Sequence, residues 1–499
     1  TALAKLGATS PATRQGLCSR SVTMVMGLPP KRQRTLADEA KQGGLWTALR
    51  RNPTGMALLG LYGMISLAFG VQVIVTTSLA AEFWEHRMTT ITSTFNVVKL
   101  AMGVVFAGPY GRFGDRYGNR IACAILALFS TAPFAALLIV GLTERGLWAA
   151  CGANLLQGFA GLTMAGAPCL FSLLHEVVLP GDFAVMTAIA CVSLGCVSII
   201  GTFACTAIQS RGGEVAVIWF GFAIGVLSTV GLAVLPQRKL GAAEGADTSA
   251  AEPGDTDRPE EGKEANAQDV PGGGGGATPC ASLSSAYFAA AHPLLLRLCV
   301  IAMLLCFSEA IATDVMNQFV LECLGWLGAA VDLQTRAKLL FHLTLALQLA
   351  LAIGCLFLSW VSTRHSTYSV LVWTSVLAAV MLMWPPMMVL MQQLWDAFVV
   401  AVCVAVSMCA MPATAAVVPL VSPPGQVGEA MGAMGSFKCM SFLVGNLICV
   451  FGVPLLQQSG VDNPLWLVFP LCSVCALCAV PLTIGLRRKA CAFGQEDKA

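Results

Sequence analysis

Apolar stretches of about 20 residues recur from Met56 to Leu486, and they constrain the fold more than any other feature of the chain. A helix of that length crosses the hydrocarbon core of a bilayer. Hydrophobic residues make up 56% of the 499 residues, charged residues only 11%, and the mean hydropathy is +0.74. A water-exposed surface needs a larger charged share. The sequence therefore predicts an all-α polytopic membrane protein.

Twelve apolar stretches are expected to be transmembrane helices, and a polar segment divides them into two groups of six. The first group covers roughly residues 56–81, 90–110, 121–142, 147–174, 183–207 and 215–235. The second group covers roughly residues 293–324, 339–361, 368–391, 394–421, 430–456 and 464–486.

Five parts follow from this pattern: a tail (1–52), a six-helix half (53–235), a linker (236–291), a second six-helix half (292–486) and a short tail (487–499). The linker is rich in glycine and acidic residues and nearly lacks large apolar ones, so it is predicted to be flexible. Residues 1–52 are basic and rich in Ser and Thr. That composition fits a disordered cytoplasmic tail and also an organelle transit peptide.

Short-loop Lys and Arg residues predict the orientation in the membrane. One side receives Arg50, Arg51, Arg112, Arg116, Arg120, Arg238, Lys239, Arg364, Arg487, Arg488 and Lys489. The opposite side receives only Arg87, Arg145, Arg211, Arg336 and Lys338. By the positive-inside rule, both termini and the linker are expected in the cytoplasm. The sequence does not distinguish the plasma membrane from an endomembrane.

The segment Gly111–Arg120 lies between the second and third predicted spans and has the pattern Gly-x-x-x-Asp-Arg-x-Gly-x-Arg. With its position, its side of the membrane and the six-plus-six layout, it resembles the signature loop of the major facilitator superfamily. The resemblance implies the major facilitator fold, with twelve helices in two halves. It also implies a gating role in the outward-open state for Gly111, Asp115, Arg116, Gly118 and Arg120. Alternatively, the arginines of this loop only set the topology.

The residue types of this segment suit such a role. Gly111 and Gly118 permit a sharp turn and a close approach to a neighbouring helix. Asp115 is expected to face the positive end of a helix, where a carboxylate is favoured. Glu429, near the cytoplasmic end of the eleventh span, is a candidate partner for the arginines.

Shorter matches resemble the branch of the superfamily that holds tetracycline-resistance-like and hippocampus-abundant-transcript-like transporters. They are Val98 and Lys99, Thr131–Pro133, Ser308–Ala310, Leu420–Ser422, and Gly432–Gly445 around Lys438.

The chain departs from the family pattern in three other places. The fourth span has Gln157-Gly158 without the preceding arginine, and the fifth span lacks the proline of drug/proton antiporters. The repeat of the signature loop is reduced to 360–364. These departures weaken drug/proton antiport as an interpretation.

Four charged residues are expected within the membrane: Lys99, Glu309, Asp314 and Lys438. A charge near mid-bilayer costs about 2.5–3.5 kcal/mol on insertion scales, so it normally faces a cavity or a partner. The resemblance places their helices beside the central cavity. Asn96, Asn317 and Gln72 are weaker candidates for contact with a solute. Gln72 is equally explained as a contact between packed helices.

Glu309 is the main candidate for proton coupling or substrate binding, because it shares one helical face with Thr313 and Asn317. Asp314 points away from that face. Lys438 and Lys99 are candidate counter-charges or anion-binding groups. The alternative is a static Glu309–Lys438 ion pair that fixes helix packing.

The sequence contains no Gly-x-x-x-x-Gly-Lys-Ser/Thr phosphate-binding loop and no convincing nucleophile–base arrangement, so ATP-driven export and enzymatic activity are not supported. The 20 cysteines follow no metal-ligand spacing. No cofactor, metal or nucleic-acid partner is expected, only a small-molecule substrate, the lipid bilayer and a proton as candidate coupling ion. The expected function is alternating-access transport of a small polar organic solute by a monomer. The alternatives are a transport-inactive receptor or adaptor with the same fold and a drug/proton antiporter.

Overall fold

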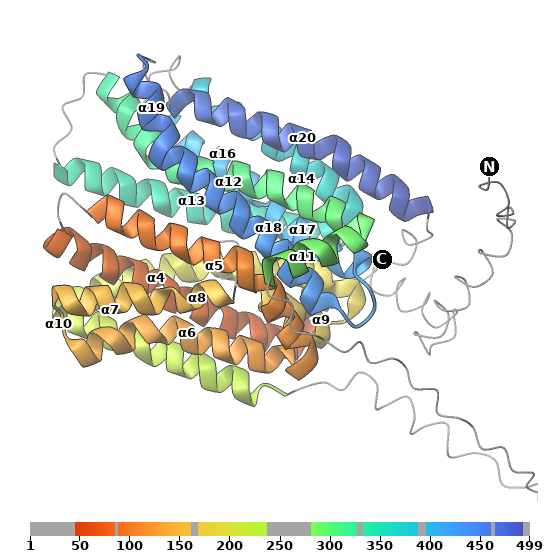
Figure 1. Ribbon diagram of the computed structural model, residues 1–499, viewed down its shortest axis with the longest axis horizontal. Helices are drawn as coiled ribbons and strands as arrows, with labels where there is room; N and C mark the ends of the chain where they lie inside the picture. Colours follow the sequence, from red (N-terminus) through yellow and green to blue (C-terminus); the bar gives the residue numbers. More distant parts are fainter. Residues whose placement is uncertain are drawn as a thin grey trace, which may run out of the picture. The chain divides into compact units, whose positions relative to one another are not determined.

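The computed structural model of the protein describes residues 45–84, 88–160, 168–236, 281–326, 333–387, 396–460 and 465–492. Within these ranges the chain is helical apart from short connections (Figure 1). Most of the predicted first tail, most of the linker and the end of the chain lie outside the described residues, so the predicted part boundaries stay predictions.

The helices that precede the linker begin with a short helix, α3, and continue with the long apolar ones. They are α3 (Leu45–Arg51), α4 (Pro53–Trp84), α5 (Met88–Tyr117), α6 (Asn119–Val140), α7 (Glu144–Asn154), α8 (Leu156–Phe159), α9 (Pro168–Val177) and α10 (Phe183–Val234).

The helices that follow the linker begin with α11 (Ala281–Ala291). They continue with α12 (Pro293–Trp326), α13 (Leu333–Ser362), α14 (Thr367–Leu382), α16 (Asp396–Met408), α17 (Ala410–Val421), α18 (Val427–Leu447), α19 (Val453–Gln458) and α20 (Leu465–Ala492).

Among the described residues, 8 helical segments are long and apolar enough to cross a membrane. The all-α polytopic fold class is therefore confirmed, and the chain is an integral multi-pass membrane protein. The predicted second and eleventh spans, α5 and α18, are absent from these 8 because their polar, charged and glycine residues lower the hydropathy. The predicted fourth span is also absent, since the described residues there form the short helices α7, α8 and α9 and residues 161–167 lie outside the described part. The predicted fifth and sixth spans form one helix, α10, which changes direction at Gly213, where φ is 69°.

The signature segment is not the loop that the sequence predicted. Helix α5 continues through Asp115 and Arg116 to Tyr117, and α6 begins at Asn119. Gly118 alone joins them, with a φ of 105° that favours glycine. The turn is thus one residue long, and the charged residues before it project from a regular helix.

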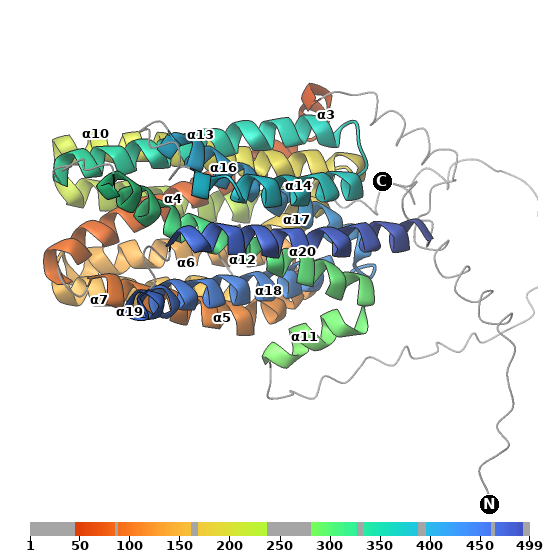
Figure 2. The same cartoon turned by 90° about the horizontal axis from the view of Figure 1, so that it is seen from above.

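Helices α5 and α18 pack against each other although they lie on opposite sides of the linker in sequence (Figure 2). Their backbones come close at three glycines, since a Cβ at Gly111 would overlap the Gly428 carbonyl oxygen and one at Gly432 would overlap the Ala107 carbonyl oxygen. Small residues allow such close crossings in membranes. Helix α10 also packs against α13, which lies on the other side of the linker in sequence.

The last residues of the predicted flexible linker are helical. Helix α11 packs on α5 and α18 and precedes α12. Ser285 of α11 is buried against Gly108 of α5. Most residues of α11 are Ala or Ser, and this concealed the contact from a composition-based prediction, which takes few large apolar residues as a sign of disorder.

Gly432→Leu is expected to force α5 and α18 apart, because its side chain would meet the α5 backbone rather than a flexible side chain. Overpacking of this kind costs about 1–3 kcal/mol. The free energy of unfolding, from denaturant melts in detergent, should fall by that amount. Gly60→Ala in α4 is the control, since a Cβ there meets nothing within 4 Å. Its stability should stay within about 1 kcal/mol of wild type. Equal stability of Gly432→Leu and Gly60→Ala would contradict the close crossing.

Candidate functional site

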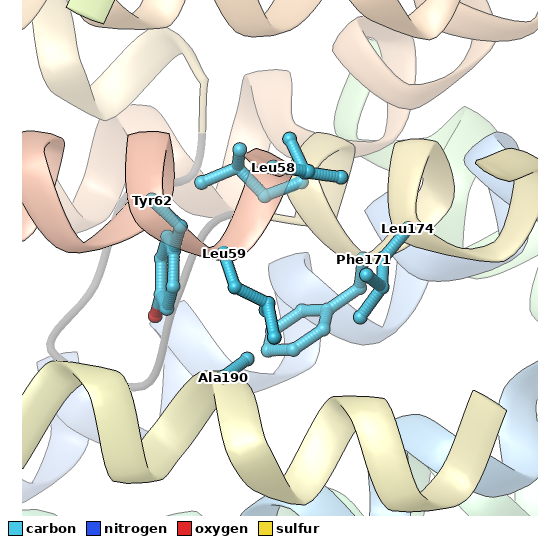
Figure 3. Close-up of a pocket in the computed structure, with 7 residues that line it drawn as sticks. Leu58, Leu59, Tyr62, Phe171, Leu174 and Ala190 are labelled. Carbon is cyan, nitrogen blue, oxygen red and sulfur yellow. The ribbon is translucent and has the colours of Figure 1, made fainter. Parts of the chain in front are cut away.

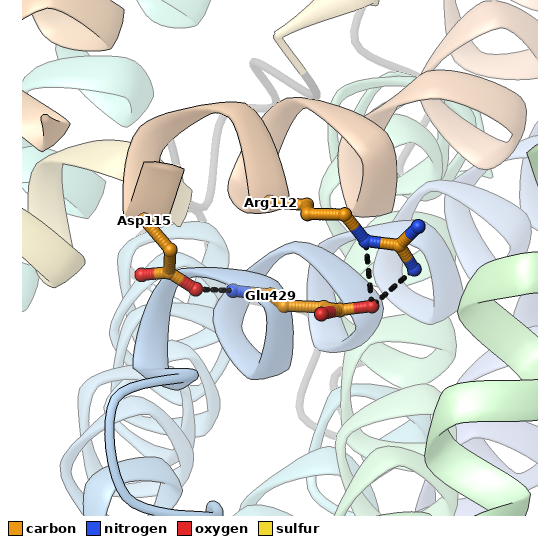
Figure 4. Close-up of polar contacts among 3 residues, drawn as sticks. All are labelled: Arg112, Asp115 and Glu429. Atoms are coloured by element: carbon orange, nitrogen blue, oxygen red, sulfur yellow. Dashed lines mark hydrogen bonds and ion pairs between the residues drawn. The ribbon is translucent and has the colours of Figure 1, made fainter. Parts of the chain in front are cut away.

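Asp115, at the end of α5, binds the first backbone amides of α18. The Gly428 N–H donates to one carboxylate oxygen of Asp115 at 2.8 Å. The Glu429 N–H donates to the other carboxylate oxygen at 2.7 Å (Figure 4). The first amides of a helix have no partner within the helix, and its positive end favours an anion. The prediction that Asp115 faces a helix N-terminus is confirmed.

A second contact runs beside the first one. Arg112, one turn before Asp115, forms an ion pair with Glu429, and its Nε donates to Glu429 Oε1 at 3.0 Å. Glu429 was the predicted partner of the arginines, and the structure assigns it to Arg112. We call the contacts of Arg112 and Asp115 with Gly428 and Glu429 the α5–α18 junction.

The remaining signature residues have separate roles. Gly111 lies within the junction as the close-approach residue, and Gly118 makes the turn. Arg120 Nη1 donates to the Leu235 carbonyl oxygen at 3.0 Å, at the end of α10. Arg116 is exposed, and its guanidinium lies 5.6 Å from the centroid of its neighbour Tyr117. Arg116 and Arg120 therefore do not take part in the junction itself.

Lys99 lies inside the protein, as the sequence predicted for a charged residue at mid-span. Its side chain is 8% exposed, and its Nζ lies 5.2 Å from the centroid of the Phe69 ring of α4. A cation over an aromatic face gains an electrostatic attraction. That attraction offsets only part of the hydration free energy that the ammonium group loses on burial.

Glu309 and Lys438 are both buried, on helices α12 and α18 that pack together. Lys438 lies within electrostatic range of Glu309. The structure describes both side chains and records no ion pair between the two at 4 Å or less. A direct static pair is therefore not formed in this conformation.

The weaker candidates are partly described. Asn96 Nδ2 donates to Asn446 Oδ1 at 3.4 Å, which links α5 to the end of α18. Gln72 Oε1 accepts from Gln157 Nε2 at 2.8 Å between α4 and α8. Asp314 and Asn317 belong to α12, but their side chains lie outside the described part of the structure. Their predicted roles stay predictions.

Gln157 was noted in the sequence only as the remnant of a family motif, and its pairing with Gln72 was not predicted. Two amides separated by 85 residues give no sequence signal, because their contact depends on how α4 and α8 pack. The proximity of Cys439 to both Lys99 and Lys438 was missed for the same reason.

A small apolar pocket lies elsewhere, between α4, α9 and α10 (Figure 3). It is lined by Leu58, Leu59, Tyr62, Leu170, Phe171, Leu174 and Ala190. Its lining offers no charged group, so it does not suit a polar solute. Within the described ranges, no group of His, Cys, Asp or Glu side chains is arranged to hold a metal ion.

Comparison with known proteins decides the fold. No family model matches the sequence, and no curated protein matches it either. The structure is similar to that of a variant of the E. coli fucose:proton symporter FucP, with a TM-score of 0.59 and 10% identity over 86% of this chain and 98% of the symporter. It is also similar to the human organic anion transporter MFSD10 (TETRAN), with a TM-score of 0.57 and 14% identity over 91% of this chain and 100% of the transporter.

The chain has the major facilitator fold. Helices α5 and α18 lie on opposite sides of the linker in sequence, so the junction connects the helices that precede the linker with those that follow it. The similarity agrees with the fold that the signature segment implied. It does not confirm the tetracycline-resistance-like branch.

Asp115→Ala is expected to loosen the junction of this major facilitator fold, because two helix amides lose their acceptor. Loss of such a cap costs about 0.5–2 kcal/mol. Amide hydrogen exchange, followed by mass spectrometry, should become faster at the end of α5 and the start of α18. Arg116→Ala is the control, since Arg116 is exposed outside the junction. Unchanged exchange in Asp115→Ala would contradict a stabilising role.

Burial raises the pKa of the Asp115 carboxyl above its ordinary value, and the amides of Glu429 and Gly428 oppose this only in part. Separation of the two helices exposes the carboxyl, so the packed junction binds the proton more tightly than the open one. By linkage, acidification favours the packed junction, and that stabilisation is lost as the pH rises through the raised pKa.

Exchange at the junction, corrected for the intrinsic pH dependence of amides, should therefore slow as the pH falls through the raised pKa of Asp115. Burial also raises the pKa of nearby Glu176, which is unchanged in the test variant. Asp115→Asn, which cannot titrate, should lose most of this pH effect. If Asp115→Asn showed the same pH dependence of exchange as wild type, another titrating group would be responsible for the effect.

Proposed function

We propose that the protein is a secondary active transporter that moves a small polar organic solute by alternating access. The observation that carries the proposal is the α5–α18 junction. It joins the two halves by contacts that can break as a unit, through two amide-to-carboxylate bonds and one ion pair. Interfaces of this kind have two discrete arrangements, as alternating access requires.

Buried charges provide the second support. Lys99, Glu309 and Lys438 lie on helices that meet across the two halves, and each is less than a tenth exposed. A scaffold or adaptor gains nothing from charges inside the membrane, and such residues typically mark solute or proton paths. A transport-inactive receptor is therefore the weaker candidate, and drug/proton antiport lacks its usual motif residues.

Proton coupling is part of the proposal, with Glu309 as the coupling carboxylate. Lys438 lies close enough to stabilise its charge without forming an ion pair in this conformation. A change in the distance between α12 and α18 during transport would change how tightly Glu309 holds a proton. One similar structure belongs to a fucose:proton symporter, and the other to an organic anion transporter.

Two finer assignments belong to the same proposal. The short matches around Lys99, Glu309 and Lys438 favour the tetracycline-resistance-like and hippocampus-abundant-transcript-like branch. The distribution of Lys and Arg favours a cytoplasmic location for both termini and the linker.

Glu309→Gln is expected to abolish uptake driven by a pH gradient, because the amide cannot carry a proton. Exchange of solute across the membrane without a gradient should remain. The measurement is uptake and counterflow of labelled polar solutes by the purified protein in liposomes. Glu144→Gln, at an exposed carboxylate in the first turn of α7, is the matched control. Gradient-driven uptake by Glu309→Gln at the wild-type rate would exclude the coupling role, and absence of uptake and counterflow in wild type would favour the adaptor.

A further inference from the structure

Lys99 is a buried cation without an acidic partner among the described side chains. Its nearest recorded contact is the face of Phe69, at 5.2 Å. The ion pair that the structure records within the described ranges lies at the α5–α18 junction and does not include it. A buried charge that lacks a partner strongly destabilises a fold. Its retention requires an anion that occupies the site for part of the working cycle.

A pair of buried amides lies on α4 and α8, the two helices that contact this lysine through Phe69 and Gly158. Gln72 follows Phe69 by three residues on α4, so the two side chains share one face of that helix. Gln157 Nε2 donates to Gln72 Oε1, and both side chains are at most 2% exposed. A Cβ at Gly158 would overlap the Lys99 carbonyl oxygen, so α8 touches α5 at the lysine. Helices α4, α5 and α8 therefore converge on one polar site.

Gln157 Oε1 has no hydrogen-bond donor among the described residues, although it is fully buried. Buried polar atoms in native structures nearly always have a partner, and an orphan atom indicates a missing ligand or water. A ligand at this site would satisfy both groups if it carried an anionic group for Lys99 and a hydrogen-bond donor for Gln157.

Among the described side chains that follow the linker, no carboxylate is recorded within electrostatic range of Lys99. Cys439 of α18 lies within electrostatic range of both Lys99 and Lys438. Of these two lysines, Lys438 is the one within range of the Glu309 carboxylate. Among the described side chains, the positive charge near Cys439 thus exceeds the negative charge, and Lys99 accounts for the excess.

We propose that Lys99 binds the carboxylate of the transported solute and that Gln157 Oε1 accepts a hydrogen bond from a hydroxyl group of the same molecule. The substrate class is therefore small organic hydroxycarboxylates. This inference rests on the proposed transport function and narrows its substrate. The bond between ammonium and carboxylate is charge-assisted and supplies most of the affinity. The amide selects the hydroxyl group, because a solute without it leaves the buried oxygen unpaired.

The first test needs no solute. Lys99→Met removes the charge and keeps the length of the side chain. If Lys99 has no protein partner, the melting temperature of the purified protein without added solute should rise. Lys489→Met, at an exposed position near the end of α20, should leave the melting temperature unchanged. A clear fall in the melting temperature of Lys99→Met would overturn the proposal, because it would show that the lysine is paired within the protein.

The second test compares matched solutes by ligand-induced stabilisation and by equilibrium binding. The three-carbon set is lactate, propionate and propane-1,2-diol, and the six-carbon set is gluconate, hexanoate and sorbitol. In at least one set, the hydroxycarboxylate should bind most tightly. Lys99→Met should weaken its binding roughly 10- to 100-fold. Gln157→Leu should abolish the preference for the hydroxycarboxylate over the plain carboxylate, and Lys489→Met should change neither.

Three outcomes would overturn the proposal. The first is that a neutral polyol binds most tightly and that Lys99→Met does not change its affinity. The second is that chloride raises the melting temperature as much as the hydroxycarboxylate does at the same concentration. The third is the absence of binding in both sets together with uptake of another solute class in the liposome assay, in which case the transport function stands. Absence of all uptake and counterflow in that assay would remove the transport function and this inference together.

Discussion

The close crossing of α5 and α18 is the constraint on which the rest of this structure depends. Gly111, Gly428 and Gly432 bring the two backbones together, and only that approach lets Asp115 reach the first amides of α18. The carboxylate supplies acceptors that the start of a helix needs. Packing and hydrogen bonding therefore depend on each other, and a change that separates the helices removes both.

This dependence makes the junction a suitable mechanical element for a transporter. The bonds involved are few and lie at the end of the helices, where the Arg112 side chain is still partly open to solvent. Exposed ion pairs are weak, so the ion pair with Glu429 adds orientation more than stability. In the proposed transport cycle, a contact of this strength would hold one arrangement of the helices and would break when a bound solute or proton favours another.

The buried charges form the second theme of the structure. Glu309 and Lys438 lie near each other without pairing, and Lys99 contacts an aromatic ring instead of a carboxylate. In a medium of low polarity each of these states is costly. The proposed transport cycle accounts for these buried charges, since a bound solute and a proton would change the charge balance around them.

Much of the site was predictable, and the limits have physical causes. The signature segment identified the fold, and the chemistry of Asp115 and Glu429 predicted what each would bind. Helix α5 was expected to end before this segment because a charged, glycine-containing stretch resembles a loop. It continues to Tyr117 because nothing before Gly118 breaks the helical backbone, and the charged side chains find partners on α18 or in solvent.

The sequence by itself determined the fold class and the chemistry available for function. Apolar length requires membrane-crossing helices, and the high cost of charges inside the membrane singled out Lys99, Glu309 and Lys438. Only the tertiary structure decided which groups meet. The Asp115 contact with α18, the Gln72–Gln157 pair and the contact of Lys99 with Phe69 all depend on helix packing. Such contacts join residues that are distant in the chain, and no local pattern of residues encodes them.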